Sequence, residues 1–154
     1  MALSTATLTV KITETLTVNG VDQGGTVTKT ISSLNQCTKR IVNVPTSSEI
    51  TVYTTGADNA SGQHDLSEVK YARLTNLDSS NYVLLRVTET NNDEFVYKLE
   101  AGCSFVLGTH SLSMSAAAAG TAGGTGDMGS ISSVELTADT AAVPVEVFIA
   151  AATD

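Results

Sequence analysis

The first strand-forming segment of the chain alternates strictly between two kinds of side chain. From Thr7 to Val18 the odd positions hold threonine or lysine, and the even positions hold leucine, valine or isoleucine, except at Glu14. Because successive side chains of a strand point to opposite faces, this period of two predicts a strand with one apolar and one hydroxyl-bearing face. Twelve residues at roughly 3.3 Å each would extend about 40 Å. The pattern predicts a sheet scaffold and contains no catalytic motif.

Turn signals divide the rest of the chain into further short strands. Asn19–Gly20 predicts a tight turn, and we expect residues 26–34 to pair antiparallel with the first strand. Pro45 ends a third strand because proline lacks the N–H that a ladder position needs. We expect about ten strands and no helix, the others lying at 38–44, 49–55, 69–77, 82–88, 94–99, 103–107, 130–138 and 143–151. The sequence predicts an all-β fold, a jelly-roll-like antiparallel β-sandwich formed by residues 1–154 as a single domain.

The apolar positions of these strands are expected to share one core. A chain of 154 residues buries about two-thirds of its unfolded surface, so this fold needs no metal or disulfide for stability. The residues expected in the core are Leu8, Val10, Ile12, Ile50, Val52, Val83, Leu85, Val87, Phe95, Leu99, Phe105, Val145 and Val147.

A low-complexity segment at 115–127 consists almost entirely of alanine, glycine, serine and threonine. Its four glycines remove the helical preference of its alanines, so we expect a flexible loop. It is either a solvent loop or a segment that docks on a neighbouring subunit, since small side chains lose little entropy on burial. Together with residues 1–7 it is a candidate interface.

The charge balance excludes one class of partner. The chain carries a formal charge of −8, and Lys39–Arg40 is its one adjacent basic pair, which opposes a nucleic-acid surface. No run of 18 apolar residues predicts a membrane span. Met1–Thr5 lacks the basic and apolar regions of a signal peptide, so we expect synthesis in a cytoplasm.

Cysteine and histidine do not indicate a metal site. Cys37 and Cys103 are far apart in sequence, and we expect two unpaired buried thiols, although spacing leaves a disulfide open. A structural zinc site needs about four ligands, and the chain has two cysteines and two histidines in all. We therefore expect no metal and no cofactor.

Catalytic patterns are missing from the sequence. His64 adjoins Asp65, but no serine stands in the Gly-x-Ser-x-Gly context of a hydrolase nucleophile. We interpret His64 and His110 as solvated loop residues, expect no catalytic residue, and expect that the chain is not an enzyme.

Two further binding sites are disfavoured. Asp58, Asp65 and Glu68 lack the spacing of a calcium loop, as do residues 91–94. Sugar-binding sandwiches commonly offer flat aromatic platforms. The chain has no tryptophan, and its four tyrosines are scattered, so we expect each to span a sheet with its hydroxyl in water; they are Tyr53, Tyr71, Tyr82 and Tyr97.

Glu14 is the one charge on the apolar side of the first strand. An inward charge on an edge strand guards against uncontrolled edge pairing. Alternatively, Glu14 pairs across an interface with a basic residue, or it lies at the rim of a sheet. The candidate basic residues are Lys39, Arg40 and Arg73.

The middle of the chain contains a recognisable progression of segments. Val69–Asp78 ends in Asn-Leu-Asp, Tyr82–Val87 is a short apolar strand, and Phe95–Leu107 contains Phe-x-x-x-Leu-x-x-Gly. A hydrophobic terminal strand, Val143–Ala151, follows. Over residues 66–152 this progression resembles small virion structural proteins of tailed bacteriophages, and is most similar to capsid decoration (cement) proteins.

The resemblance implies a function in assembly. Decoration proteins sit on the outer capsid surface, often as trimers, and brace the major capsid protein lattice. The resemblance therefore implies the major capsid protein and further copies of this chain as partners, and the virion as the location. Two alternatives stay open: a phage tail (tube) component, with residues 7–34 as its long hairpin, and an extracellular filament subunit assembled by strand exchange.

Overall fold

The regular structure of the chain consists of β-strands alone. The computed structural model describes residues 5–54, 69–89, 94–107, 113–114 and 129–152. Every regular element in these residues is a strand, and every strand pairing is antiparallel. The predicted all-β antiparallel architecture is therefore confirmed. Thirteen strands occur in this part of the chain, three more than the ten expected, and three of the thirteen are two residues long: β2 (Thr17–Val18), β3 (Val21–Asp22) and β11 (Ser113–Met114).

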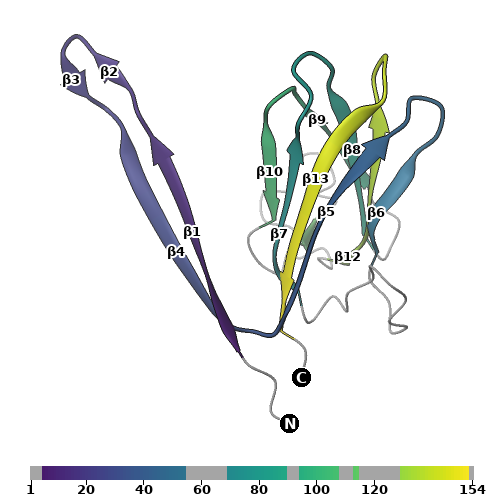
Figure 1. Ribbon diagram of the computed structural model, residues 1–154, viewed down its shortest axis with the longest axis horizontal. Coiled ribbons are helices and arrows are strands. Elements are labelled where there is room, and N and C mark those ends of the chain that lie inside the picture. Colours follow the sequence, from purple (N-terminus) through teal and green to yellow (C-terminus); the bar gives the residue numbers. More distant parts are fainter. Residues whose placement is uncertain (1–4, 55–68, 90–93, 108–112, 115–128, 153–154) are drawn as a thin grey trace, which may run out of the picture.

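Nine strands form two sheets that face each other across an apolar core (Figure 1). The first sheet has the order β10-β7-β13-β5, and in the second sheet β12 has β6 and β11 on one side and β8, then β9, on the other. The first sheet contains β5 (Gln36–Val44), β7 (Val69–Asn76), β10 (Ser104–Leu107) and β13 (Val143–Ala151). Besides β11, the second contains β6 (Ile50–Thr54), β8 (Val83–Glu89), β9 (Glu94–Leu99) and β12 (Gly129–Ala138).

The core follows the alternation of these strands. On β13, for example, the residues at 143, 145, 147 and 149 are buried and those between them face outward. The core prediction is confirmed for Val52, Val83, Leu85, Val87, Leu99, Val145 and Val147. Ile50, Phe95 and Phe105 are half-buried at its margin. Sequence reasoning left out Val44, Leu74, Val134, Leu136, Val143 and Ile149, which are also buried.

The remaining strands form a hairpin that projects from the sandwich (Figure 1). We call residues 6–34 the arm. Its two long strands, β1 (Ala6–Glu14) and β4 (Gly25–Leu34), pair as predicted, and β2 and β3 form its tip. The expected core position of Ile12 is wrong: its side chain is 56% exposed, because the arm diverges from the sandwich before it reaches this residue.

The predicted strand over residues 7–18 is interrupted after Glu14. At this point the backbone of Gly24 approaches the backbone of Glu14 so closely that a Cβ on Gly24 would lie 2.3 Å from the carbonyl oxygen of Glu14. At the tip, Asn19 and Gly20 have φ angles of 52° and 78°, as a two-residue hairpin turn requires. The predicted turn is therefore confirmed, and the predicted continuous strand is divided into β1 and β2.

A bulge at the base of the arm directs the chain into the sandwich. The pairing of β1 with β4 shifts register between Ala6 and Leu8, and Ser33 has a φ of 61°. Such bulges bend a strand and increase its twist. Beyond Ser33, the N–H of Asn35 donates to the carbonyl oxygen of Ala151 at 3.2 Å, and the chain continues as β5.

Candidate functional site at the projecting arm

The arm has two chemically different faces. Its register places Leu8 opposite Ile31 and Ile12 opposite Val27. We call this side the apolar face; it contains Leu8, Val10, Ile12, Glu14, Val27, Lys29 and Ile31. The other side, the threonine face, contains Thr9, Lys11, Thr13, Thr26, Thr28 and Thr30. Thr13 Oγ1 and Thr26 Oγ1 lie 3.2 Å apart across it.

Only the base of the apolar face is covered. Leu8, Val10 and Ile31 pack against a small cluster on the outer face of the first sheet. This cluster contains Leu34, Tyr71, Phe148 and Ala150, and the rings of Tyr71 and Phe148 meet edge to face at 5.9 Å. The contact anchors the arm to the sandwich at one end.

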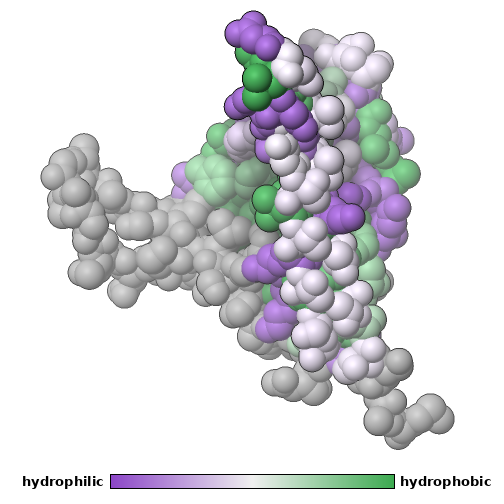
Figure 2. Space-filling view, turned by 90° about the vertical axis from the view of Figure 1, so that its left-hand side faces the viewer, coloured by the Kyte–Doolittle hydropathy of each residue, from purple (hydrophilic) through white to green (hydrophobic). Residues whose placement is uncertain are grey.

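Beyond its base the arm leaves a groove beside the first sheet. The groove has a volume of about 530 Å³ and is lined on the arm side by β1 residues that include Val10 and Ile12. Its opposite wall is formed by Tyr71, Arg73, Ser104, Val106 and Phe148. The arm seen from outside is pale and purple over most of its length, so its polar side points away from the sandwich (Figure 2). The apolar face is therefore turned toward the sandwich. Beyond its base, Ile12 lines the groove and is 56% exposed, and Val27 on the neighbouring strand β4 is 70% exposed.

One residue of this wall, Arg73, belongs to an ion-pair cluster on the outer face of the first sheet. Glu146 accepts from Lys39 at 3.0 Å and from Arg73, whose guanidinium carbon also lies 5.9 Å from the ring centre of Phe148. The hydrogen bond from Lys39, supported by the charge of Arg73, lowers the pKa of Glu146 below its ordinary value. Both cations are thus engaged within the sandwich.

Glu14 has no ion-pair partner among the residues that the structure describes. Two of its candidate partners, Lys39 and Arg73, pair with Glu146. The third, Arg40, donates through Nη2 to the carbonyl oxygen of Val52 at 2.7 Å and so joins the first sheet to β6. Among the described residues, the carboxylate of Glu14 therefore lies without an ion-pair partner on an otherwise apolar face.

The charge of the chain is distributed unevenly. The arm contains two lysines and two acidic residues, Glu14 and Asp22, and is neutral. Residues 35–154 contain the other six basic and fourteen acidic residues, which gives the whole net charge of −8. The arm is therefore the neutral part of an acidic protein.

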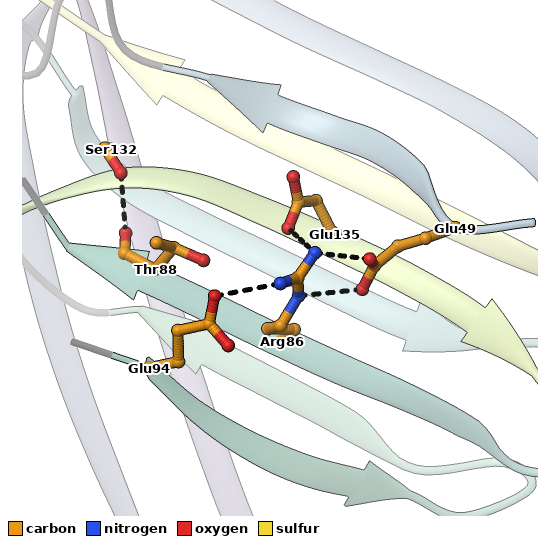
Figure 3. Close-up of polar contacts among 6 residues, drawn as sticks. All are labelled: Glu49, Arg86, Thr88, Glu94, Ser132 and Glu135. Atoms are coloured by element: carbon orange, nitrogen blue, oxygen red, sulfur yellow. Dashed lines mark hydrogen bonds and ion pairs between the residues drawn. The ribbon is translucent and has the colours of Figure 1, made fainter. Parts of the chain in front are cut away.

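The outer face of the second sheet carries a separate cluster around Arg86 (Figure 3). Its Nε donates to Glu49 at 2.9 Å, Nη1 to Glu94 at 2.8 Å, and Nη2 lies 2.8 Å from Glu135. The hydrogen bond to Glu49 raises the pKa of Arg86 above its ordinary value. Because one guanidinium on β8 joins carboxylates on β9, on β12 and in the residue before β6, the cluster ties these four strands together at their outer face.

The cysteines are unpaired as predicted, but their predicted burial is wrong. Cys37, on β5, and Cys103, in the turn before β10, are both unpaired as expected, but both are exposed. Cys37 points outward because it lies opposite Ala150 in the register, on the face away from the core. In the described ranges no group of three or more histidine, cysteine or acidic side chains is placed to hold a metal.

The tyrosines have different environments. Tyr71 is buried under the base of the arm, whereas Tyr97 is exposed at the edge of β9 with its ring 5.2 Å from that of Phe105. The hydroxyl of Tyr82 hydrogen-bonds Asp139, which raises the pKa of Tyr82. Tyr71 and Tyr97 thus pack at separate places, Tyr71 as a buried residue and Tyr97 as an exposed one.

Several sequence candidates lie outside the described residues. They are Asp58, His64, Asp65, Glu68 and His110, together with residues 1–4 and the segment 115–127. Conversely, sequence reasoning did not identify the groove beside the arm. The available signal was a pair of strands with one apolar face each and no third strand assigned to cover it.

Comparisons of the chain with protein-family models, with curated proteins and with solved structures give no match. Among the described residues there is no helix of the length and apolar character that crossing a bilayer requires.

Proposed function

We propose that the chain is a virion structural protein that decorates a bacteriophage capsid and stabilises it by binding the lattice of the major capsid protein. The observation that carries this proposal is the exposed apolar face at Ile12 and Val27 on a projecting arm. A two-stranded hairpin is marginally stable alone in water, so an apolar face of this kind favours a function in which other subunits cover it.

The connectivity of the sandwich supports the proposal, and we propose that it is a jelly roll. Its strands pair in nested fashion: β5 with β13, β6 with β12, β7 with β10, and β8 with β9. This is the order expected when one long antiparallel hairpin rolls up into two sheets. Jelly rolls occur in viral capsid proteins, which agrees with the resemblance of residues 66–152 to phage virion proteins.

The proposed mechanism is mass action. A protein that binds the intact capsid lattice but not its separated subunits stabilises the lattice by its binding free energy. Several copies joined in one homo-oligomer would gain avidity because each engages its own capsid subunit. The partners in this proposal are the major capsid protein and further copies of this chain, on the outer surface of the virion, with neither nucleic acid nor membrane involved.

The arm also favours a second candidate, a component of the phage tail. Tube proteins typically carry a long hairpin, and β1 with β4 forms one. They typically carry a helix beside the barrel as well, and the described residues contain none. An extracellular filament built by strand exchange is the third candidate, because the open edges of the arm would accept or donate strands.

Electron microscopy of particles that carry the protein separates these candidates. Knobs on the shell support decoration, stacked rings indicate a tail tube, and threads indicate a filament. In a binding assay, purified protein added to capsids that lack it should occupy the shell and raise the temperature at which DNA is released. Deletion of residues 120–126 should lower occupancy if that segment docks on the lattice, and full occupancy would assign it to solvent.

A further inference from the structure

We propose that two copies of this chain associate about a two-fold axis by interlocking their arms, each arm lying in the groove of the other copy with the two apolar faces in contact. This inference concerns the free protein in solution and deepens the proposed function, because it names a second copy of the chain as the subunit that covers the apolar face. The groove beside the first sheet and the uncovered half of the apolar face are the surfaces it uses.

The charge distribution favours a second copy as the occupant. Two copies that each carry −8 repel one another, and the arm is the part of the chain without net charge. A contact made through the arms therefore joins two copies through a surface without net charge. The contact also covers Ile12 and Val27, which are exposed in the single chain.

The positions of the charges on the apolar face match a two-fold contact. The face consists of successive cross-strand rows: Val10 with Lys29, Ile12 with Val27, and Glu14 with Gly25. An antiparallel two-fold contact centred on the Ile12 row places each Val10–Lys29 row over the Glu14–Gly25 row of the other copy. Glu14 and Lys29 have no ion-pair partner among the described residues, and this contact brings each to the other twice.

Gly25 contributes space for this contact. A Cβ built on Gly25 would have no atom within 4 Å, so the surface above it is open. The long side chain of Lys29 from the other copy would enter above Gly25 and reach Glu14. Its aliphatic stem would cover apolar surface while the ammonium group pairs with the carboxylate.

The groove wall matches the other side of an entering arm. With its apolar face on the resident arm, the entering arm presents its threonine face to the first sheet. That wall offers the hydroxyl of Ser104, which lies 2.8 Å from the hydroxyl of Thr75, and the guanidinium of Arg73. Threonine hydroxyls of the entering arm would face the hydroxyl of Ser104 there.

Contact between apolar faces requires a two-fold axis rather than a ring. In a ring, each arm enters the next groove, so its apolar face would have to cover two different neighbouring arms at once. In a two-fold pair each apolar face covers only one other, and the same patch on both copies forms a self-complementary interface. The proposed assembly is therefore a dimer.

The contact is large enough for a stable dimer. The long strands of the arm have nine and ten residues. At roughly 3.3 Å per residue the arm is about 30 Å long, and two strands with their side chains are about 10 Å wide, so each face covers about 300 Å². The base of the apolar face is already covered within each chain, so about half of each arm is free for the contact. The two arms and the groove walls they cover then remove on the order of 1,000 Å² from water, about the area that a specific interface needs.

The first test measures the mass of the full chain in solution by light scattering and sedimentation. We expect a dimer. The double variant Ile12→Thr, Val27→Thr keeps β-branched side chains but loses the apolar contact, and its dissociation constant should rise about 100-fold or more. Val96→Thr on the outer face of the second sheet, where Val96 is 58% exposed, is the matched control and should stay dimeric.

The second test uses the charges. Glu14→Lys alone would place lysines against Lys29 of the other copy, and Lys29→Glu alone would place glutamates against Glu14, so each variant alone should dissociate. Mixed together, the two variants should form a heterodimer, because each charged position then meets its opposite. A wild-type monomer, a trimer, a monomeric Val96→Thr variant, or a mixture that stays monomeric would overturn the proposal.

Discussion

The side-chain amide of Asn76, in the first sheet, donates a hydrogen bond of 3.1 Å to the carbonyl oxygen of Leu99, in the second. The same amide donates to the carbonyl oxygen of Asn81 at 2.9 Å, and its Oδ1 accepts from the N–H of Asp78 at 2.9 Å. Asn76 is completely buried. Its three bonds hold both sheets and the turn between β7 and β8 in one arrangement.

Replacing this side chain should therefore destabilise the sandwich. Asn76→Ala leaves two buried carbonyl oxygens and one N–H without their partner, which should lower the free energy of unfolding by about 2–4 kcal/mol. Urea unfolding followed by circular dichroism measures the change. Asn43→Ala, at an exposed position on β5, should change stability by less than about 0.5 kcal/mol. Equal effects of the two variants would contradict the assigned role of Asn76.

Leu84 and Leu85 test the register of β8. Leu85 is fully buried between the sheets, whereas its neighbour Leu84 points outward and is 40% exposed. Leu85→Ala should lower the free energy of unfolding by about 2–5 kcal/mol because it leaves a cavity in the core. Leu84→Ala should cost less than about 1 kcal/mol. The reverse order would show that β8 is shifted by one residue.

The sandwich was predictable because both of its sheets obey one local rule. Alternation and turn residues placed most strands within two residues of their observed ends, including β9 and β13 with their full bounds. The rule does not give strand order, since the pairing of β5 with β13 joins residues about a hundred positions apart. Nor does the rule predict that Arg40 faces inward on β5 and donates a hydrogen bond to the carbonyl oxygen of Val52.

The arm shows where the same rule fails. Leu8, Val10 and Ile12 have the alternation of core residues, and the sequence does not say whether a second layer lies above them. The outcome depends on the bulge at Ser33, which turns the chain away from the arm's direction as it enters the sandwich. A serine gives no sequence signal for a positive φ. Alternation alone therefore could not predict the exposure of Ile12, on which the candidate site depends.

Gly24 should be intolerant of any side chain. A Cβ there would lie 2.3 Å from the carbonyl oxygen of Glu14, which belongs to the backbone and cannot yield without shifting β1. Gly24→Ala should therefore destabilise the upper arm locally, by about 1–3 kcal/mol, and accelerate hydrogen exchange of amides in β1 and β4. Exchange in β13 should stay unchanged.

The adjacent glycine provides the control for this experiment. A Cβ on Gly25 would meet no atom within 4 Å, so Gly25→Ala should leave exchange in the arm of the single chain close to that of the wild type. Exchange should be compared in dilute protein, so that contacts between copies do not protect the arm. Accelerated exchange in both variants would show that the close approach of Gly24 to the carbonyl oxygen of Glu14 is not what destabilises the arm.

Acid should weaken the outer face of the first sheet through Glu146. The hydrogen bond from Lys39 and the charge of Arg73 hold the pKa of this carboxyl below its ordinary value of 4.5. Since the folded state then binds fewer protons than the unfolded state, the contribution is complete above pH 4.5 and is lost as the pH falls through the lowered pKa. Wild type should exceed Glu146→Gln in unfolding free energy at pH 7, and the difference should shrink as the pH falls below 4.5 through the lowered pKa.

A second variant assigns this pH dependence to its cause. Lys39→Met removes the donor that contributes most to the shift, so adding Glu146→Gln to Lys39→Met should produce a smaller pH-dependent change than adding it to the wild type. Sodium chloride at about 1 M should reduce the effect in the wild type as well, because Lys39 is well exposed and its charge is screened. If the Glu146→Gln difference is the same at pH 7 and in acid in both backgrounds, the ion pairs of Glu146 do not contribute to folding stability.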